Sequence, residues 1–248
     1  IFVTRFMISI QKIQKLKKMK KNNKLDYAIL SSNRYLAILY FVFLSKVFKF
    51  KTIFNYVEYY PGQKKKWYQF GKKLNDFLFD KYGPQHVDAV LPISEFLINN
   101  FQKVVPQKKY LKIPVLTDIK RYDGIEILNE QKYFIYCGDA AYNEIIKFII
   151  DSFEKLKAPA TFLYLVINGM EKDMLEVGNY IDNSSCKDKI KIFSKLSDKT
   201  LSGYYKNALA LLIPLRPTLQ DKARFPHKIG EYLASGNPVI STNYGEVT

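Results

Sequence analysis

Short apolar runs alternate with longer amphipathic segments along most of this 248-residue chain. Apolar runs bounded by turn residues are typical of buried strands, and amphipathic segments with helical periodicity are typical of helices. Strands that alternate with helices indicate βαβ units, in which the strands pair in parallel. The sequence therefore predicts an α/β protein with parallel sheets.

The alternation falls into two series with an interruption between them. In the first series we expect strands at residues 24–31, 51–58, 87–92 and 110–113, and helices at 34–48, 64–82 and 94–101. In the second we expect strands at 132–137, 161–167, 190–193, 209–213 and 238–241, and helices at 143–156, 170–181, 199–206 and 226–234. Residues 114–131, with Pro114, Gly124 and mixed charges, break the rhythm. We therefore expect two Rossmann-like domains, at residues 1–118 and 132–248, joined by a linker at 119–131.

Two helices of the first series carry finer signals. Ser94 stands directly before the helix expected at 94–101 and is a good N-cap residue. In the helix expected at 64–82, five apolar side chains recur at helical spacing: Trp67, Phe70, Leu74, Phe77 and Leu78. Of these, we expect Trp67, Phe70 and Phe77 to lie in the core.

The charge of the chain is strongly positive. It has 39 Lys and Arg against 23 Asp and Glu, a formal net charge of +16, but only five of the basic residues are Arg. Positive charge favours anionic partners such as lipid headgroups, phosphates or nucleic acid. The lysine clusters at 17–21, 64–66 and 72–73 would be solvated, or would hold the chain at an anionic membrane surface. Since no nucleic-acid-binding motif is found, we expect no nucleic acid partner.

The cysteine and histidine content argues against disulfide and metal frameworks. Cys137, Cys186, His86 and His227 are too few for either, so we expect no structural zinc site and a reducing, cytoplasmic setting. The longest apolar stretch, residues 35–48, contains Lys46 and is too short to span a bilayer. The chain begins without Met or signal-peptide order and ends just after an expected strand, so we expect a piece truncated at both ends.

The spacing of the glycines excludes several enzyme classes. The sequence has no G-x-G-x-x-G fingerprint of dinucleotide-binding enzymes and no glycine followed by Lys-Ser or Lys-Thr, as a P-loop requires. It also lacks H-E-x-x-H and G-x-S-x-G, the motifs of zincins and α/β-hydrolases.

Residues 211–246 hold the most informative segment. An apolar strand ends at Pro214, and a polar, basic loop runs to Phe225. Pro226 suits the first position of a helix, where its missing N–H costs nothing. The helix would end at Ala234, with Gly236 as its left-handed cap, and an apolar strand follows at once.

The start of this helix has the composition of an anion site. Free N–H groups and the helix dipole favour phosphate there. Lys222, Arg224 and Lys228 add positive charge, and His227 and Lys228 project near Glu231 on one face. A carboxylate one turn beyond a phosphate site is placed to accept both hydroxyls of a ribose. A nucleoside diphosphate would fit these residues.

Residues 225–242, FPHKIGEYLASGNPVIST, resemble the C-terminal donor motif of the retaining glycosyltransferases of family four. These enzymes have the GT-B fold, in which two Rossmann-like domains face each other across a cleft. Weaker similarity is found at residues 87–101 and 111–118. Glu58 ends a strand where such enzymes often carry a His- or Glu-containing loop, and is therefore a candidate catalytic residue.

The sequence departs from the family pattern in two places. The resemblance makes Glu231 the ribose ligand, but the motif's first glutamate falls on Ala223, and Asp221 is the candidate that would replace it in catalysis. The loop at Gly138 lacks the family's arginine for the diphosphate, so the resemblance implies that Gly138 offers backbone to the donor while other basic residues hold phosphate. The full set of expected donor-binding residues is Gly138, Lys222, Arg224, Pro226, His227, Lys228 and Glu231.

The resemblance implies a metal-independent hexosyltransferase without a cofactor. It would move a sugar from a nucleotide-sugar to a glycan or lipid-linked acceptor with retention, in polysaccharide biosynthesis, at the inner face of the membrane. The gaps in the motif leave two alternatives open. One is a non-catalytic nucleotide-sugar-binding or scaffold protein, and the other is a nucleotide-sugar epimerase of GT-B fold.

Overall fold

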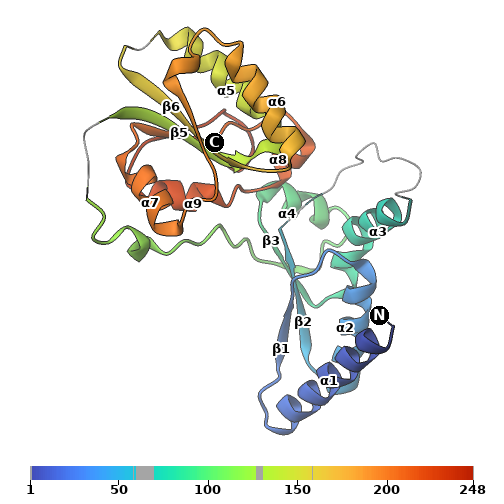
Figure 1. Cartoon of the computed structure of the whole chain (residues 1–248). Coiled ribbons are helices and arrows are strands. Elements are labelled where there is room, and N and C mark those ends of the chain that lie inside the picture. Colours follow the sequence, from blue (N-terminus) through green and yellow to red (C-terminus); the bar gives the residue numbers. More distant parts are fainter. Residues whose placement is uncertain (1, 58, 60–69, 127–130, 158, 248) are drawn as a thin grey trace. The chain divides into compact units, whose positions relative to one another are not determined.

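The computed structural model describes residues 2–57, 59, 70–126, 131–157 and 159–247. Contacts divide the chain into two compact units (Figure 1). The N-terminal unit comprises Ile1–Pro114 and Lys222–Arg224, and the C-terminal unit comprises Val115–Asp221 and Phe225–Thr248. The division falls slightly before the expected boundary at residue 118. The described part of the expected linker packs against helices of the C-terminal unit.

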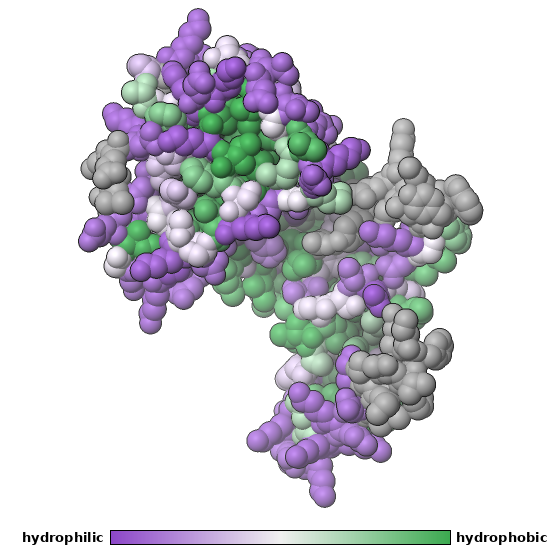
Figure 2. Space-filling model, in the orientation of Figure 1, coloured by the Kyte–Doolittle hydropathy of each residue, from purple (hydrophilic) through white to green (hydrophobic). Residues whose placement is uncertain are grey.

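The N-terminal unit contains the alternating elements that the sequence predicts. They are α1 (Phe2–Lys21), β1 (Tyr27–Leu30), α2 (Tyr35–Phe48), β2 (Lys51–Tyr56), α3 (Phe70–His86), β3 (Ala89–Pro92), α4 (Glu95–Gln102) and β4 (Lys109–Tyr110). The strands pair in parallel in the order β1-β2-β3-β4. Helix α1 was not expected, and its lysine-rich end and the turn to β1 form a hydrophilic tip of the unit (Figure 2). Of the helix expected at 64–82, residues 64–69 lie outside the described residues.

The N-cap expected at Ser94 is confirmed. Its Oγ accepts a hydrogen bond from the Leu97 N–H at 3.2 Å, and its backbone is extended as a cap requires. Such a cap stabilises a helix by about 1 kcal/mol. It therefore sets the start of α4 directly after β3.

The buried face expected for the helix at 64–82 is wrong in the described residues. Phe70, Leu74 and Phe77 are 68%, 45% and 52% exposed, whereas the core side of α3 carries Phe79 and Gly83. A Cβ at Gly83 would lie 3.0 Å from the Phe54 ring, and the rings of Phe54 and Phe79 pack edge to face at 5.1 Å. The close approach at a glycine selects the helix face, and apolar spacing alone does not reveal it. Trp67 lies outside the described residues.

The C-terminal unit repeats the strand–helix alternation. Its elements are η2 (Ile119–Tyr122), β5 (Lys132–Asp139), η3 (Ala140–Tyr142), α5 (Asn143–Leu156), β6 (Thr161–Asn168), α6 (Glu171–Asp182), η4 (Lys187–Lys189), β7 (Ile190–Phe193), α7 (Asp198–Asn207), β8 (Ala210–Leu212), α8 (Leu219–Ala223), α9 (Lys228–Ala234), β9 (Val239–Ile240) and η5 (Gly245–Val247). The strands are parallel, in the order β7-β6-β5-β8-β9. Strand order therefore reverses between β5 and β8, and ligands of such sheets bind beyond the carboxyl ends of the strands near that reversal.

Helices cover both faces of this sheet (Figure 1). Leu163, Leu165 and Ile167 of β6 join the core beneath α5 and α6, whereas Tyr164 and Val166 join the core beneath α7 and α9. Side chains of a strand alternate between the two faces, so a strand buried on both is apolar throughout. This explains the uninterrupted apolar run of β6. The sheet therefore separates two cores within the C-terminal unit, one on each of its faces.

The segment between β8 and β9 differs from its expected form at one end and matches it at the other. Helix α9 begins at Lys228, so the expected start at Pro226 was two residues too early; the Pro226 carbonyl instead accepts the Ile229 N–H at 3.0 Å. The short helix α8 lies where a loop was expected. Gly236 has φ +84°, which confirms the left-handed cap.

Candidate ligand-binding site

A charged cavity of about 620 Å³ lies between η2, α7 and α9 in the C-terminal unit. Lys228 and Glu231 of α9 line it, so the structure brings together two of the residues expected to bind a donor. The other lining residues were not expected from the sequence: Asp118, Arg121, Asp123, Ile125, Asp198, Lys199, Leu201 and Ser202. Both signs of charge therefore meet in one cavity.

The two carboxylate oxygens of Glu231 have different surroundings. Its Oε1 lies 3.3 Å from Arg121 Nη1, and its Oε2 lies 3.7 Å from Lys228 Nζ. Oε2 is buried and accepts no hydrogen bond from the described residues. Leaving a buried acceptor unsatisfied costs about 1–3 kcal/mol, more for a charged group. A hydroxyl donated by a ligand would remove that cost.

Arg121 is anchored on two sides. Its Nε donates to Ser202 Oγ at 3.1 Å, and its guanidinium lies 5.7 Å from the centre of the Tyr122 ring. The Tyr122 hydroxyl donates to the Glu231 carbonyl oxygen at 2.6 Å. These contacts fasten η2 to α7 and α9. One signal in the sequence could have found Arg121: it is an arginine where the chain overwhelmingly uses lysine.

Burial raises the pKa of Tyr122 to about 12. The nearby Arg121 charge opposes that rise in pKa, and the Glu231 charge adds to it. The Tyr122 phenol therefore stays protonated, and able to donate to the α9 backbone, well above neutral pH.

Gly230 lets the chain before η2 pack against α9. A Cβ at Gly230 would lie 3.1 Å from Val115 Cγ1 and 3.4 Å from Thr117 Cβ. A larger residue would push this segment outward and move Arg121 with it. The glycine within the motif thus helps to position residues far away in the sequence.

Asp221 is occupied by its own loop. It is fully buried, and its carboxylate accepts hydrogen bonds from the Arg216 backbone N–H at 2.9 Å, from Nε at 3.0 Å and from Nη2 at 3.3 Å. Such a bidentate, charge-assisted pair fixes geometry firmly. The arrangement favours a role in holding the loop after β8, and catalysis by Asp221 stays a prediction.

Gly138 lies near the end of β5, at the expected edge of the sheet. A Cβ there would collide with the hydroxyl of Tyr136, so the missing side chain makes room for a neighbour on the same strand. The expected approach of a ligand to this backbone remains a prediction.

The other expected site residues do not line the charged cavity or fall outside the described residues. Pro226 is half-buried and His227 exposed, and they precede α9 without lining the cavity. Lys222 and Arg224 group with the N-terminal unit, where Ser94 Oγ donates to the Ala223 carbonyl at 2.6 Å. Glu58 lies outside the described residues. The site that can be described therefore centres on Glu231 and Lys228.

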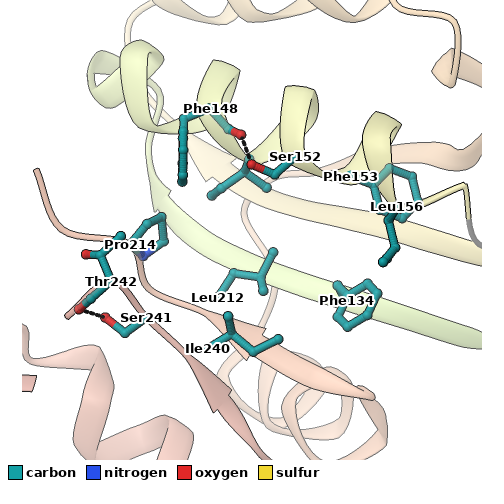
Figure 3. A pocket seen from close by; sticks show the side chains of 11 residues that line it. Phe134, Phe148, Ser152, Phe153, Leu156, Leu212, Pro214, Ile240, Ser241 and Thr242 are labelled. Carbon is teal, nitrogen blue, oxygen red and sulfur yellow. Dashed lines mark hydrogen bonds between the residues drawn. The ribbon is translucent and has the colours of Figure 1, made fainter. Parts of the chain in front are cut away.

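An apolar cavity of about 280 Å³ lies on the opposite face of the same sheet, between α5 and strands β5, β8 and β9 (Figure 3). Its polar groups bond to the protein itself: Ser152 Oγ donates to the Phe148 carbonyl at 2.7 Å, and Ser241 Oγ donates to the Ile213 carbonyl at 2.9 Å, with the Thr242 carbonyl farther away at 3.4 Å. Figure 2 shows hydrophobic surface ringed by hydrophilic residues on the C-terminal unit. The lining of the apolar cavity offers few groups that could orient a charged ligand.

The described residues contain no group of three or more His, Cys, Asp or Glu side chains placed to hold a metal ion. Among the same residues, no helix combines the length and the apolar character that crossing a bilayer requires.

Comparisons with known proteins agree with this architecture. Residues 119–248, just over half of the chain, match the family "Glycosyl transferases group 1". Sucrose-phosphate synthase from Thermosynechococcus elongatus aligns with a TM-score of 0.67 and 15% identity over 95% of this chain and 62% of its own. HepE from Anabaena, solved in complex with UDP, aligns with a TM-score of 0.65 and 12% identity over 95% of this chain and 64% of its own.

A third solved structure is the pneumococcal O-GlcNAc transferase GtfA in complex with UDP and GlcNAc. It aligns with a TM-score of 0.58 and 18% identity over 94% of this chain and 46% of its own. This chain therefore spans about half to two thirds of the length of these structures. No curated protein sequence matches it. The expected fold class, α/β of GT-B type, is confirmed.

Proposed function

Since this chain belongs to the group 1 glycosyltransferases, we propose that it takes part in the transfer of a sugar from a nucleotide-sugar to a glycan or lipid-linked acceptor. The proposal includes retention at the anomeric carbon, as the resemblance of residues 225–242 implies. The donor would lie against the C-terminal unit, in the charged cavity between η2, α7 and α9.

The observation that carries the proposal is the buried Oε2 of Glu231, which accepts no hydrogen bond from the described residues. Two vicinal hydroxyls of a ribose can both donate to one carboxylate, and hydrogen bonds to a charged group contribute about 1.5–3 kcal/mol. Lys228, 3.7 Å from this oxygen, supplies positive charge beside the same volume. A ribose carrying phosphate would satisfy both side chains.

Two of the similar structures contain bound UDP, which is the leaving group that a UDP-sugar would release. Negative charge on a leaving diphosphate needs compensation, which lysine and arginine side chains can provide without a metal. We therefore propose metal-independent transfer of a hexose. The lysine-rich end of α1 supports peripheral attachment to an anionic membrane. The proposal extends to attachment on the cytoplasmic side and to a role in polysaccharide biosynthesis.

Two observations keep the non-catalytic alternative in view. The buried ion pair of Asp221 with Arg216 leaves that carboxylate committed to the loop, and Ala223 stands at the position of the motif's first glutamate. A scaffold that binds a nucleotide-sugar without transferring it would need only the cavity at Glu231.

Release of nucleoside diphosphate tests the proposal. The protein is incubated with a panel of nucleotide-sugars in the presence of EDTA, and free nucleoside diphosphate and sugar products are measured. Slow release is expected for one donor. Binding without release would favour the scaffold, an isomerised sugar the epimerase, and no binding to any donor would contradict the proposal.

A matched pair of variants locates the site. Glu231→Ala is expected to weaken binding of the preferred nucleoside diphosphate by about 1–3 kcal/mol in calorimetry. Glu176→Ala is the control, because Glu176 also pairs with a lysine, Lys147, but lies on α6 at the other face of the sheet. Equal affinity of the two folded variants would remove Glu231 from the site.

A further inference from the structure

We propose that Arg121 is a positioning residue, which orients the Glu231 carboxylate for the two ribose hydroxyls. This inference rests on the proposed function, since it concerns the same cavity. Arg121 lies in η2, outside the donor motif, and its Nη1 lies 3.3 Å from Glu231 Oε1. The remaining oxygen, Oε2, is then the one left to accept from a ligand.

The guanidinium of Arg121 is held by a buried partner as well as by Glu231. Ser202 is 1% exposed, and its Oγ accepts from Arg121 Nε at 3.1 Å. One planar group thus bonds α7 through Nε and faces α9 through Nη1. Since the donors of a guanidinium have fixed relative directions, holding one of them fixes the other.

The backbone that carries Arg121 is also fixed. Asp118 Oδ1 accepts the Lys120 N–H at 3.0 Å and caps the start of η2. The Tyr122 carbonyl accepts from Lys206 Nζ at 3.1 Å, and the Tyr122 hydroxyl donates to the Glu231 carbonyl. Arg121 and Glu231 are therefore tied together through both backbone and side chain, unlike a pair of freely moving surface charges.

Lys228 explains why Glu231 needs such a partner. Its Nζ lies 3.7 Å from Glu231 Oε2, close enough to attract the carboxylate but longer than a hydrogen bond. Without Arg121 on the other side, the carboxylate would turn toward Lys228 and form a direct pair. The oxygen that would accept from the ribose hydroxyls would then be occupied by Lys228.

A lysine at position 121 would keep the charge without the geometry. A single ammonium group at the end of a flexible chain lacks the rigid fork that spans Ser202 and Glu231. Arg121→Lys therefore separates orientation of the carboxylate from its electrostatic environment. Ser202→Ala removes only the hydrogen bond from Arg121 Nε, and it should also lower affinity for the ribonucleotide, but by less.

The test uses UDP and GDP, each compared with its 2′,3′-dideoxy analogue, in calorimetry on the whole chain. The unsubstituted protein should bind the ribonucleotide more tightly than the dideoxy analogue. Arg121→Lys should lower affinity for the ribonucleotide about tenfold, the low end for a hydrogen bond to a charged group, and leave the analogue unchanged. Arg34→Lys, an exposed arginine of the N-terminal unit, is the matched control and should change neither.

The ratio of the two affinities does not depend on the fraction of folded protein, so partial unfolding of a variant cannot imitate the expected result. Equal loss for both nucleotides would show that Arg121 only maintains the fold, and unchanged affinities would show no role; either result overturns the inference. If Arg121→Lys still binds the ribonucleotide more tightly than its dideoxy analogue, whereas Glu231→Ala does not, the proposed function stands and the positioning role of Arg121 is rejected. An unsubstituted protein that binds neither nucleotide would reject both.

Discussion

The charged cavity and the apolar cavity of the C-terminal unit lie on opposite faces of one sheet and have opposite chemistry. The charged cavity lies beside α7 and α9 and gathers acidic, basic and hydroxyl side chains. The apolar cavity lies beside α5 and is lined almost wholly by carbon, with its hydroxyls bonded to nearby carbonyl groups (Figure 3). Ligand recognition needs polar groups whose hydrogen bonds are left for the ligand, and the charged cavity has one at Glu231.

The two cavities differ in chemistry because different elements of the fold line them. On the side of α5, the strands and helices of the repeating βα units meet with apolar side chains from both partners. On the side of α9, η2 inserts a segment from outside that repeat and brings Arg121 and Asp118 against the helices. We therefore expect substitutions on the α5 side to change stability and substitutions on the α9 side to change binding.

The largest expected effect is on stability, from the core beneath α5. Leu163→Ala removes a fully buried side chain and should lower the free energy of unfolding by about 2–5 kcal/mol, through lost burial and the cavity left behind. Urea unfolding measures this change. Affinity of the folded variant for nucleoside diphosphate should stay the same. A parallel loss of affinity would contradict the expectation that the α5 side affects stability and the α9 side affects binding.

A smaller effect is expected from pH on the side of α9. Because the pKa of Tyr122 is raised to about 12 in the folded protein, its contribution to stability is fully present below pH 10 and is lost as pH rises toward 12. The loss amounts to roughly 2 kcal/mol. Between pH 9 and 11.5, stability should therefore fall more steeply in the unsubstituted protein than in Tyr122→Phe. Identical slopes would show that burial of this phenol does not matter.

The smallest effect is expected in the apolar cavity. The Ser152 hydroxyl bonds only to the Phe148 carbonyl of its own helix among the interactions described, and the side chain is exposed. Ser152→Ala should raise the free energy of unfolding by about 0.5 kcal/mol, because alanine favours helix more than serine. Thermal unfolding and nucleotide binding are both measured. A clear drop in affinity would mean that this cavity, too, contacts the ligand.

The sequence predicted the order of elements well because each signal was local. Apolar runs placed β5 and β6, and cap residues placed the start of α4 and the end of α9. Those signals depend on neighbours within a few residues. The start of α9 was misjudged by two residues, because the preference of Pro226 for a first helical position is weaker than the turn it actually forms.

The candidate site was only partly predictable. Glu231 and Lys228 share one helix, so their spacing alone brought them together. Arg121 and Ser202 come from η2 and α7, and no periodic pattern connects them to α9. Asp221 looked available in the sequence, but its partner Arg216 and its complete burial appeared only in the folded loop.

The amino-acid sequence by itself determined that this chain forms parallel α/β units and that residues 225–242 resemble the donor motif of the family-four glycosyltransferases. Periodicity, capping and motif spacing are properties of neighbouring residues, so they can be recognised before folding. Only the tertiary structure decided which face of α3 is buried and which side chain pairs with Glu231. Those choices depend on close approaches between distant residues, such as Gly83 with Phe54 and Gly230 with Val115, where the absence of a Cβ permits contact.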